Sequence, residues 1–134
     1  MISFIPDLDK SMIGLLGINI TELTENQVTA TMPVDERTRQ PYGILHGGAS
    51  VALAETVASV GTWNLIDRET ENAVGLEINA NHIRSISEGT VTAVATPLHK
   101  GRRTMVWNIQ ITDAAGKLIC ISRCTVAIIK KDCQ

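Results

Sequence analysis

One helical stretch decides the fold of this chain: residues 47–65 read GGASVALAETVASVGTWNL. Apolar residues recur at helical spacing through Val51, Ala54 and Ala58, which predicts a long helix over these residues. Many of its side chains are small, so other elements can pack closely around it. Glu55 is its only acidic residue, and a carboxylate among apolar side chains costs free energy unless it is paired or used. The stretch therefore predicts a buried helix that carries one functional carboxylate.

Segments typical of β-strands lie on both sides of this helix. Residues 18–34 alternate between apolar and polar, most clearly at 28–32, and predict one strand before the helix. Residues 8–16 predict a short amphipathic helix that Gly17 stops. Segments rich in Val, Ile and Thr follow the long helix at Ala73–Ile83, Thr90–Pro97, Thr104–Thr112 and Lys117–Ile129. This order predicts one α+β domain over residues 1–134, in which an antiparallel sheet packs on one helix. Uncovered sheet and strand edges favour association of subunits.

Composition narrows the class of protein. The net charge of −2 gives no electrostatic reason to expect nucleic acid or an anionic membrane as partner. No apolar run reaches the ~18 residues of a membrane span, and the N-terminus lacks a secretory signal, so we expect a cytoplasmic protein. Cys120 and Cys124 share one face of a strand, but ~13 Å between their Cα atoms is too far for a disulfide. We expect no metal site, and no role for Cys133 in the tail.

The glycine pair that opens the helix suits chemistry in which negative charge develops on a carbonyl oxygen. The first turn of a helix has unpaired N–H groups and a partial positive charge, and glycine lets a carbonyl approach closely. Gly47 N–H is therefore our candidate oxyanion donor, with Gly48 in support; the alternative is a glycine turn needed only for chain geometry. Glu55 can act as nucleophile or as general base, or it can be a buried glutamate with a structural partner. Ser59, one turn further, can hold the carboxylate or a water, or bond to its own backbone.

Distance places the two catalytic groups on different subunits. Gly47 and Glu55 are eight residues apart, which is ~12 Å along one helix. They cannot reach the same carbonyl carbon from one straight helix. We therefore predict a homodimer at least, in which Glu55 of one subunit faces Gly47 of the other across antiparallel helices.

Other polar residues flank these groups. His46 can orient the substrate or Gln40, or simply cap the helix. Gln40 can bond to the carbonyl or the glutamate, or be solvated. No serine or cysteine completes a nucleophilic triad. Positive and donor groups gather after two predicted strands, where they can reach a phosphate or remain solvated: His82, Ile83, Arg84 and Ser85, and then His99, Lys100, Gly101, Arg102, Arg103 and Thr104.

Several motifs carry a resemblance to a known family. They are QPYGILHGGAS at 40–50 with ALAE at 52–55, MPVD at 32–35, VGLEINANH at 74–82 and PLH at 97–99. These motifs resemble the hotdog-fold thioesterases, in the branch that hydrolyses aryl-acyl thioesters and includes the 4-hydroxybenzoyl-CoA thioesterases. Residues 75–82 most resemble the 1,4-dihydroxy-2-naphthoyl-CoA hydrolases of menaquinone synthesis.

The resemblance implies a hotdog fold, in which a sheet of five or six strands wraps around one helix, and a tetramer of such subunits. It implies that Gly47 donates to the oxyanion, that His46 lies near the thioester, and that Gly75, residues 82–85 and residues 99–104 line the path of CoA. The expected reaction is hydrolysis of an aromatic acyl-CoA, with 1,4-dihydroxy-2-naphthoyl-CoA as the favoured substrate and no cofactor. Alternatives are proofreading of misloaded carrier proteins, a broad acyl-CoA thioesterase, an enoyl-CoA hydratase and a non-enzymatic acyl-CoA-binding module.

Overall fold

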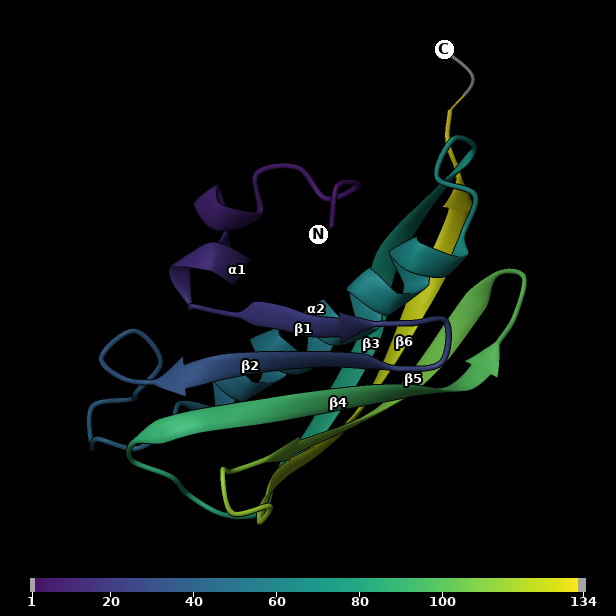
Figure 1. Ribbon diagram of the computed structural model, residues 1–134. Coiled ribbons are helices and arrows are strands. Elements are labelled where there is room, and N and C mark those ends of the chain that lie inside the picture. Colours follow the sequence, from purple (N-terminus) through teal and green to yellow (C-terminus); the bar gives the residue numbers. More distant parts are fainter. Residues whose placement is uncertain (1, 133–134) are drawn as a thin grey trace.

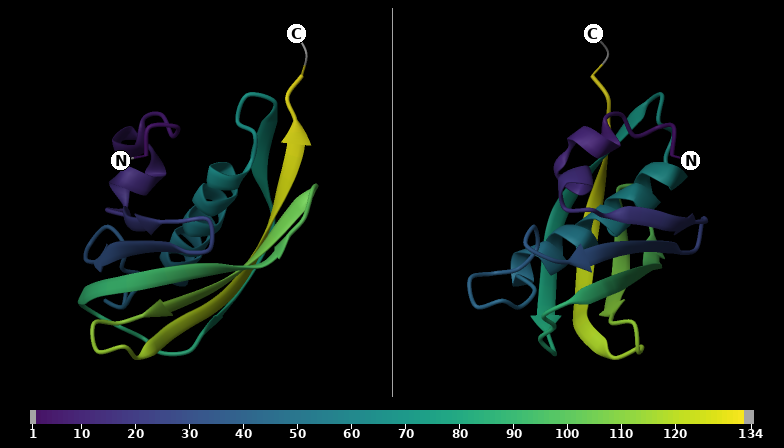
Figure 2. Two further views of the ribbon diagram at one scale, coloured as in Figure 1. Left: turned by 45° about the vertical axis from the view of Figure 1, so that its right-hand side comes forward. Right: turned by 60° about the vertical axis from the view of Figure 1, so that its left-hand side comes forward.

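A curved antiparallel sheet holds one long helix against its concave face (Figures 1 and 2). The computed structural model describes residues 2–132. The strands follow the order β1-β2-β4-β5-β6-β3 in one six-stranded sheet, which agrees with the predicted α+β fold. The helical elements are η1 (Leu8–Lys10), α1 (Met12–Leu15) and α2 (Gly47–Leu65), and the strands are β1 (Asn19–Leu23), β2 (Val28–Val34), β3 (Glu71–His82), β4 (Gly89–Lys100), β5 (Thr104–Thr112) and β6 (Leu118–Lys130).

Helix α2 has the bounds that the sequence predicts. It begins after His46, which has an extended backbone and caps the first turn, and it ends before Ile66, where the backbone is extended again. The helix contacts every strand of the sheet, and its buried residues are mostly small or β-branched. Nine of its nineteen residues are buried and only Gly48 is exposed, which explains why the sequence lacks a wide polar face here.

Trp107 in β5 fixes the depth at which α2 sits in the sheet. Its side chain is fully buried, and its Nε1–H donates to Oγ1 of Thr62 at 2.9 Å. The Thr62 hydroxyl in turn donates to the carbonyl of Ala58 at 2.9 Å. A Cβ at Gly61 would lie only 2.6 Å from the indole ring. The absence of a side chain at this position therefore lets the indole pack directly on the helix backbone.

Two regions before α2 differ from prediction. Residues 8–16 form η1 and α1 rather than one helix, because Ser11 between them is extended and its hydroxyl donates to the Leu8 carbonyl at 2.8 Å. Residues 18–34 form a hairpin of two strands rather than one strand. Its turn is closed by the Thr24 hydroxyl, which accepts the N–H of Asn26 at 3.2 Å and of Gln27 at 3.0 Å. That turn contains no glycine or proline, so the usual sequence signal is missing.

Strand β3 lies at one edge of the sheet and pairs only with β6. Residues 83–88 carry the chain from the end of β3 across to β4, whose neighbours are β2 and β5. The edge strand leaves apolar side chains exposed, among them Val74 and Leu76. No helix among residues 2–132 is long and apolar enough to span a bilayer.

The contact between Gly61 and Trp107 predicts an unusual response to alanine. Gly61→Ala should lower the free energy of unfolding by about 1–3 kcal/mol, because the new Cβ overlaps the indole ring. In an exposed helix the same change would stabilise by up to ~1 kcal/mol. Urea unfolding at one fixed protein concentration measures the effect, with Asn64→Ala as a control that should change stability by less than ~0.5 kcal/mol. A Gly61→Ala protein as stable as the wild type would contradict the close packing.

Candidate active site

The start of α2 leaves one backbone amide free. The N–H of Gly48 donates to Nδ1 of His46 at 2.7 Å, and the N–H groups of Ala49 and Ser50 donate to the His46 carbonyl at 3.0 and 3.3 Å. In the part of the chain that the structure describes, Gly47 N–H has no acceptor. The geometry therefore favours Gly47 alone as the donor at the helix start, because the predicted supporting donor, Gly48, is already engaged.

His46 is the cap of α2, as the structural alternative expected. Because Nδ1 accepts the Gly48 N–H, the neutral ring carries its proton on Nε2. The side chain is exposed, so this second nitrogen is accessible as a donor. The cap and the predicted role beside a thioester are thus compatible, and the second role stays a prediction.

Gln40 and the end of β3 form a cavity with the helix start. This cavity of about 330 Å³ is lined by Gln40, Gly47, His82, Arg84 and Ser85, among others. The Gln40 side-chain oxygen accepts the N–H of Tyr42, which leaves its amide NH₂ group to donate to a ligand. A Cβ at Gly47 would lie 2.8 Å from Nε2 of His82, so the imidazole packs on the helix start. The structure thus brings most of these predicted residues together in one chain.

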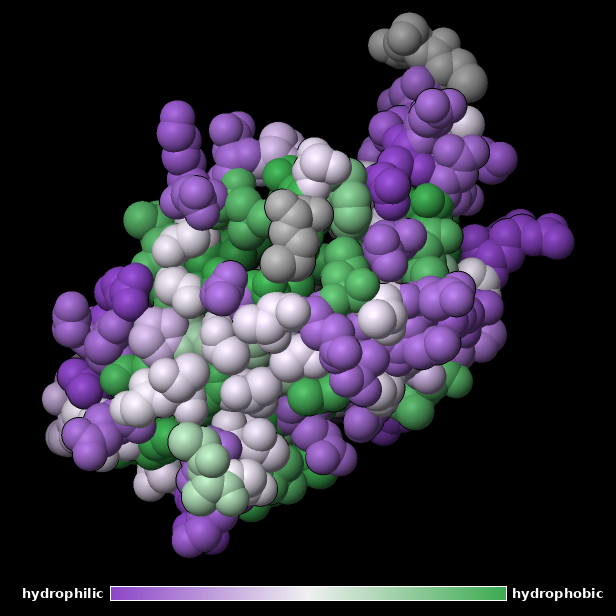
Figure 3. All heavy atoms as spheres, in the orientation of Figure 1, coloured by the Kyte–Doolittle hydropathy of each residue, from purple (hydrophilic) through white to green (hydrophobic). Residues whose placement is uncertain are grey.

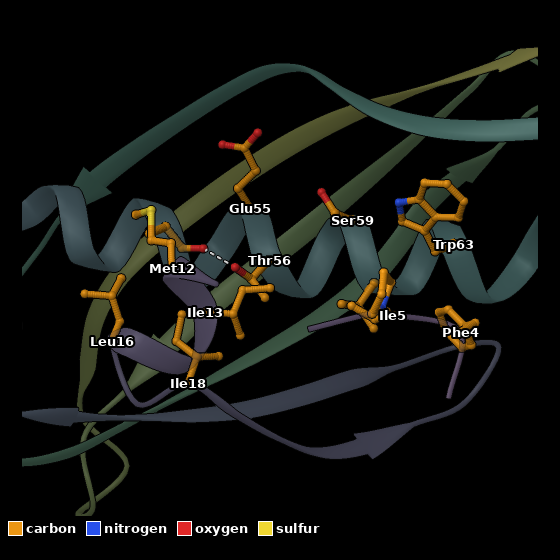
Figure 4. Close-up of a pocket in the computed structure, with 13 residues that line it drawn as sticks. Phe4, Ile5, Met12, Ile13, Leu16, Ile18, Glu55, Thr56, Ser59 and Trp63 are labelled. Carbon is orange, nitrogen blue, oxygen red and sulfur yellow. Dashed lines mark hydrogen bonds between the residues drawn. The ribbon is translucent and has the colours of Figure 1, made fainter. Parts of the chain in front are cut away.

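Glu55 lies in a different cavity, of about 560 Å³ (Figure 4). Its half-buried carboxylate accepts no hydrogen bond from the described residues. Oε2 lies over the backbone of Gly75 in β3, so close that a Cβ on residue 75 would overlap it. Gly75 therefore makes room for the carboxylate, and its predicted contact with CoA stays a prediction.

Ser59 shares this cavity with Glu55, one helical turn further along α2 (Figure 4). Thr56 donates its hydroxyl to the carbonyl of Ala52 at 2.6 Å, as polar residues inside helices often do. Among the described residues, Ser59 makes no such bond to its own backbone. Its hydroxyl is therefore available to a ligand or a water beside the carboxylate.

The two catalytic candidates occupy separate cavities in one chain. Gly47 lines the smaller cavity and Glu55 the larger, and neither residue lines both. This separation agrees with the ~12 Å expected from the helix rise. One chain alone does not place the free amide and the carboxylate around the same atom.

The two predicted phosphate-binding clusters lie at opposite ends of the sheet. His82 pairs with Cys120 on β6, whereas Thr104 pairs with Ala127, which is ~23 Å further along the strand. In the second cluster, Lys100 Nζ donates to Oδ1 of Asn26 at 3.0 Å. A path of CoA along both clusters therefore stays a prediction.

Cys120 and Cys124 are structural rather than catalytic residues. Cys120 and Cys124 are buried free thiols on the core side of β6, and Cys133 lies outside the described residues. Burial, and then the negative charges of Glu55 and Glu77, raises the pKa of the Cys124 thiol to about 12. Burial also raises the pKa of Cys120. These thiols stay protonated at neutral pH, so neither is an activated nucleophile.

The sequence analysis missed the N-terminal wall of the Glu55 cavity. Seven of its thirteen lining residues come from residues 4–18, and six come from α2, among them Trp63. Apolar side chains gather between the N-terminal segment and the adjacent ends of β3 and β6 (Figure 3). The apolar start of the chain was the available signal, with Ile2, Phe4 and Ile5 close together. No group of His, Cys, Asp or Glu within residues 2–132 has the arrangement of a metal site.

An antiparallel sheet of six strands wrapped around one long helix is a hotdog fold. The sequence profile described as the thioesterase superfamily matches residues 42–120. The chain belongs to this superfamily, which confirms the predicted class of enzyme and the predicted fold.

Known proteins resemble the chain over most of its length. ComA2 of Bacillus subtilis (strain 168), an esterase by name, is 59% identical over 93% of this chain and 99% of its own. The 1,4-dihydroxy-2-naphthoyl-CoA hydrolase of Escherichia coli (strain K12) is 51% identical over 90% of this chain and 88% of its own. A crystal structure of a mutant of thioesterase PA1618 from Pseudomonas aeruginosa superposes with a TM-score of 0.90, at 45% identity over 92% and 89% of the two chains.

The contact between Glu55 and Gly75 predicts a catalytic effect from a change in β3. Gly75→Ala places a methyl group too close to Oε2 and displaces the carboxylate, which should lower kcat by up to ~10²-fold. Because β3 is exposed here, the melting temperature should change little. The control is Asn79→Ala on the same strand, which should leave kcat unchanged. Unchanged kcat in Gly75→Ala would show that the carboxylate does not work from this position.

The raised thiol pKa predicts a loss of stability at high pH. An unfolded Cys124 loses its proton near the ordinary value of 9.0, whereas the folded thiol keeps its proton to about pH 12. The unfolded state therefore binds fewer protons above pH 9, and the free energy of unfolding falls between pH 9 and 12. Urea unfolding at a series of pH values should show a shallower fall for Cys124→Ala. Equal slopes for the two proteins would refute the shift.

Proposed function

We propose that the protein hydrolyses an aromatic acyl-CoA thioester, with 1,4-dihydroxy-2-naphthoyl-CoA of menaquinone synthesis as its substrate. One observation carries the proposal: within residues 2–132, the same helix presents an amide without an acceptor at Gly47 and a carboxylate without a donor at Glu55. Acyl transfer needs these two groups, a donor for the developing oxyanion and a nucleophile or base. The 51% identity to a hydrolase of that name supports the choice of substrate.

The groups suit a definite sequence of steps. Gly47 N–H and the amide of Gln40 stabilise the negative charge on the carbonyl oxygen. As a base, Glu55 takes a proton from a water whose oxygen attacks the carbonyl carbon; the C–S bond then breaks, and the CoA thiolate leaves and takes up a proton. As a nucleophile, Glu55 forms an anhydride and releases the same thiolate, and water then cleaves the anhydride. Both routes need Glu55 ionised beside the thioester.

The site requires a second subunit in this proposal. The long edge strand β3 runs past Glu55 with its outer backbone groups unpaired and Val74 and Leu76 exposed. Such an edge favours pairing with another strand. A two-fold pair of subunits would bring Gly47 of one chain to Glu55 of the other and create two equal sites. The tetramer, the cytoplasmic location and the absence of a cofactor stay predictions.

Two variants at Gly47 distinguish the effect of losing its N–H from the effect of adding a side chain at the helix start. Gly47→Pro removes the N–H, and proline suits both the first position of a helix and the extended backbone of His46 before it. Gly47→Ala keeps the N–H but adds the Cβ that meets His82. We expect kcat of Gly47→Pro to fall ~10²–10³-fold below that of Gly47→Ala. Steady-state kinetics with naphthoyl-CoA measure both, and equal rates in the two variants would exclude the amide as the oxyanion donor.

Mixed oligomers test the shared site directly. Glu55→Gln alone should lose ~10²–10⁴-fold in kcat, because the amide is neither base nor nucleophile. Co-expression of Glu55→Gln and Gly47→Pro chains should restore roughly a quarter of the wild-type activity, since half the dimers are mixed and each has one intact site. If each site lies within one chain, the mixture gains nothing. Sequential affinity tags isolate the mixed dimers.

A substrate panel separates the alternatives. Release of free thiol from aryl-CoA, aliphatic acyl-CoA and aryl-carrier-protein thioesters distinguishes the proposed reaction from broad hydrolysis and from proofreading. If the carrier-protein thioester is hydrolysed far faster than the CoA thioester, the reaction is proofreading and the assignment to menaquinone synthesis fails. Loss of enoyl absorbance would indicate a hydratase, and tight binding without turnover would indicate an acyl-CoA-binding module.

A further inference from the structure

The Glu55 cavity has a direction along α2. Glu55, Ser59 and Trp63 follow at intervals of four residues, so they form one stripe on the helix, and all three line the cavity. Toward the start of the helix, Ala52 of α2 lines it together with Met12 and Leu16 of the N-terminal segment (Figure 4). In the opposite direction, the cavity extends from the carboxylate toward Trp63, which is eight residues or ~12 Å further along the axis.

The N-terminal segment covers the far end of this cavity. Phe4 and Ile5 lie at the same end of the helix as Trp63 in Figure 4, and all three line the cavity. Arg68, just after α2, places its guanidinium 4.2 Å from the centroid of the Phe4 ring, and its Nη1 donates to the carbonyl of Trp63 at 2.9 Å. One side chain thus joins the N-terminal segment to the end of the helix, and the far end of the cavity is a built wall with two aromatic rings.

The chemistry of the lining selects a flat apolar ligand. Polar groups lie along the stripe at Glu55 and Ser59, whereas the end near Trp63 is aromatic and aliphatic. Aromatic rings favour stacked or edge-on contact with another ring. The volume of about 560 Å³ lies within the ~300–1,000 Å³ typical of small-molecule sites. An acyl group attached at Glu55 would pass Ser59 and end against the rings.

We propose that Phe4, Ile5 and Trp63 form an end wall that determines acyl specificity, favouring acyl groups of two fused rings over those of one ring. This inference rests on the proposed thioesterase reaction at Glu55. A single ring beside the carbonyl ends near Ser59, ~6 Å along the axis, and leaves the wall uncontacted. A second fused ring extends the contact to Trp63 and Ile5.

Filling the end of the cavity tests the proposal. Ile5→Trp should lower kcat/KM for naphthoyl-CoA about tenfold or more, because the second ring no longer fits, while kcat/KM for benzoyl-CoA stays within about twofold. Trp63→Ala should reduce the preference for naphthoyl-CoA over benzoyl-CoA about tenfold through lost ring contact. The matched control is Leu15→Trp in the same segment, where the side chain is 67% exposed and does not line the cavity. Melting temperatures and oligomer size verify that each variant is folded.

Two results would overturn the end wall. If kcat/KM falls equally for naphthoyl-CoA and benzoyl-CoA in folded Ile5→Trp, the substitution disturbs the chemistry rather than the fit of the acyl group. If kcat/KM changes for neither substrate, the acyl group lies elsewhere. Calorimetry with naphthamide and benzamide, which are neutral and not thioesters, gives a readout without turnover. If the wild type hydrolyses neither CoA ester, the proposed reaction fails. The end wall is then still supported if naphthamide binds Ile5→Trp ten times more weakly than the wild type. Equal binding of naphthamide to the two proteins still refutes it.

Discussion

The close packing of helix α2 inside the curved sheet is the constraint on which the rest of the structure depends. The indole of Trp107 presses on the helix backbone at Gly61 and bonds to Thr62, so the helix can neither slide nor turn without losing a buried hydrogen bond. A rigid helix fixes the positions of Gly47 and Glu55 with it. Catalytic groups held on such an element keep their geometry better than groups on loops.

Two polar groups of this helix, the Gly47 amide and the Glu55 carboxylate, have no hydrogen-bond partner among residues 2–132 and are therefore available to a ligand. His46 satisfies three amides of the first turn, two with its carbonyl and one with Nδ1, and the one left over is Gly47 N–H. At the middle of the helix, Gly75 gives Glu55 space but no donor. A free donor and a free carboxylate both cost free energy when they are half-buried. Bound substrate and water are the natural partners of both.

Local patterns were sufficient to predict the helix and its two catalytic candidates, because the glycine pair at 47–48 and the lone acid Glu55 can be recognised without knowledge of the fold. The strands after α2 were also predicted to within a few residues. The β1–β2 hairpin was not, because its turn at Thr24 uses a side-chain hydroxyl rather than glycine or proline. The separation of His82 from Thr104 and the N-terminal wall depend on strand order and tertiary packing, which no local pattern encodes.

The proposed catalytic groups and the proposed specificity wall occupy different positions along helix α2. The proposed chemistry takes place at Gly47 and Glu55, whereas the wall formed by Phe4, Ile5 and Trp63 lies on the other side of Ser59 from the carboxylate. The wall residues do not line the cavity of the oxyanion donor. A change in the wall therefore alters which acyl group fits without moving the groups that attack it. In a shared site, the chain that supplies the carboxylate would also choose the acyl group, and its partner would supply only the amide that stabilises the oxyanion.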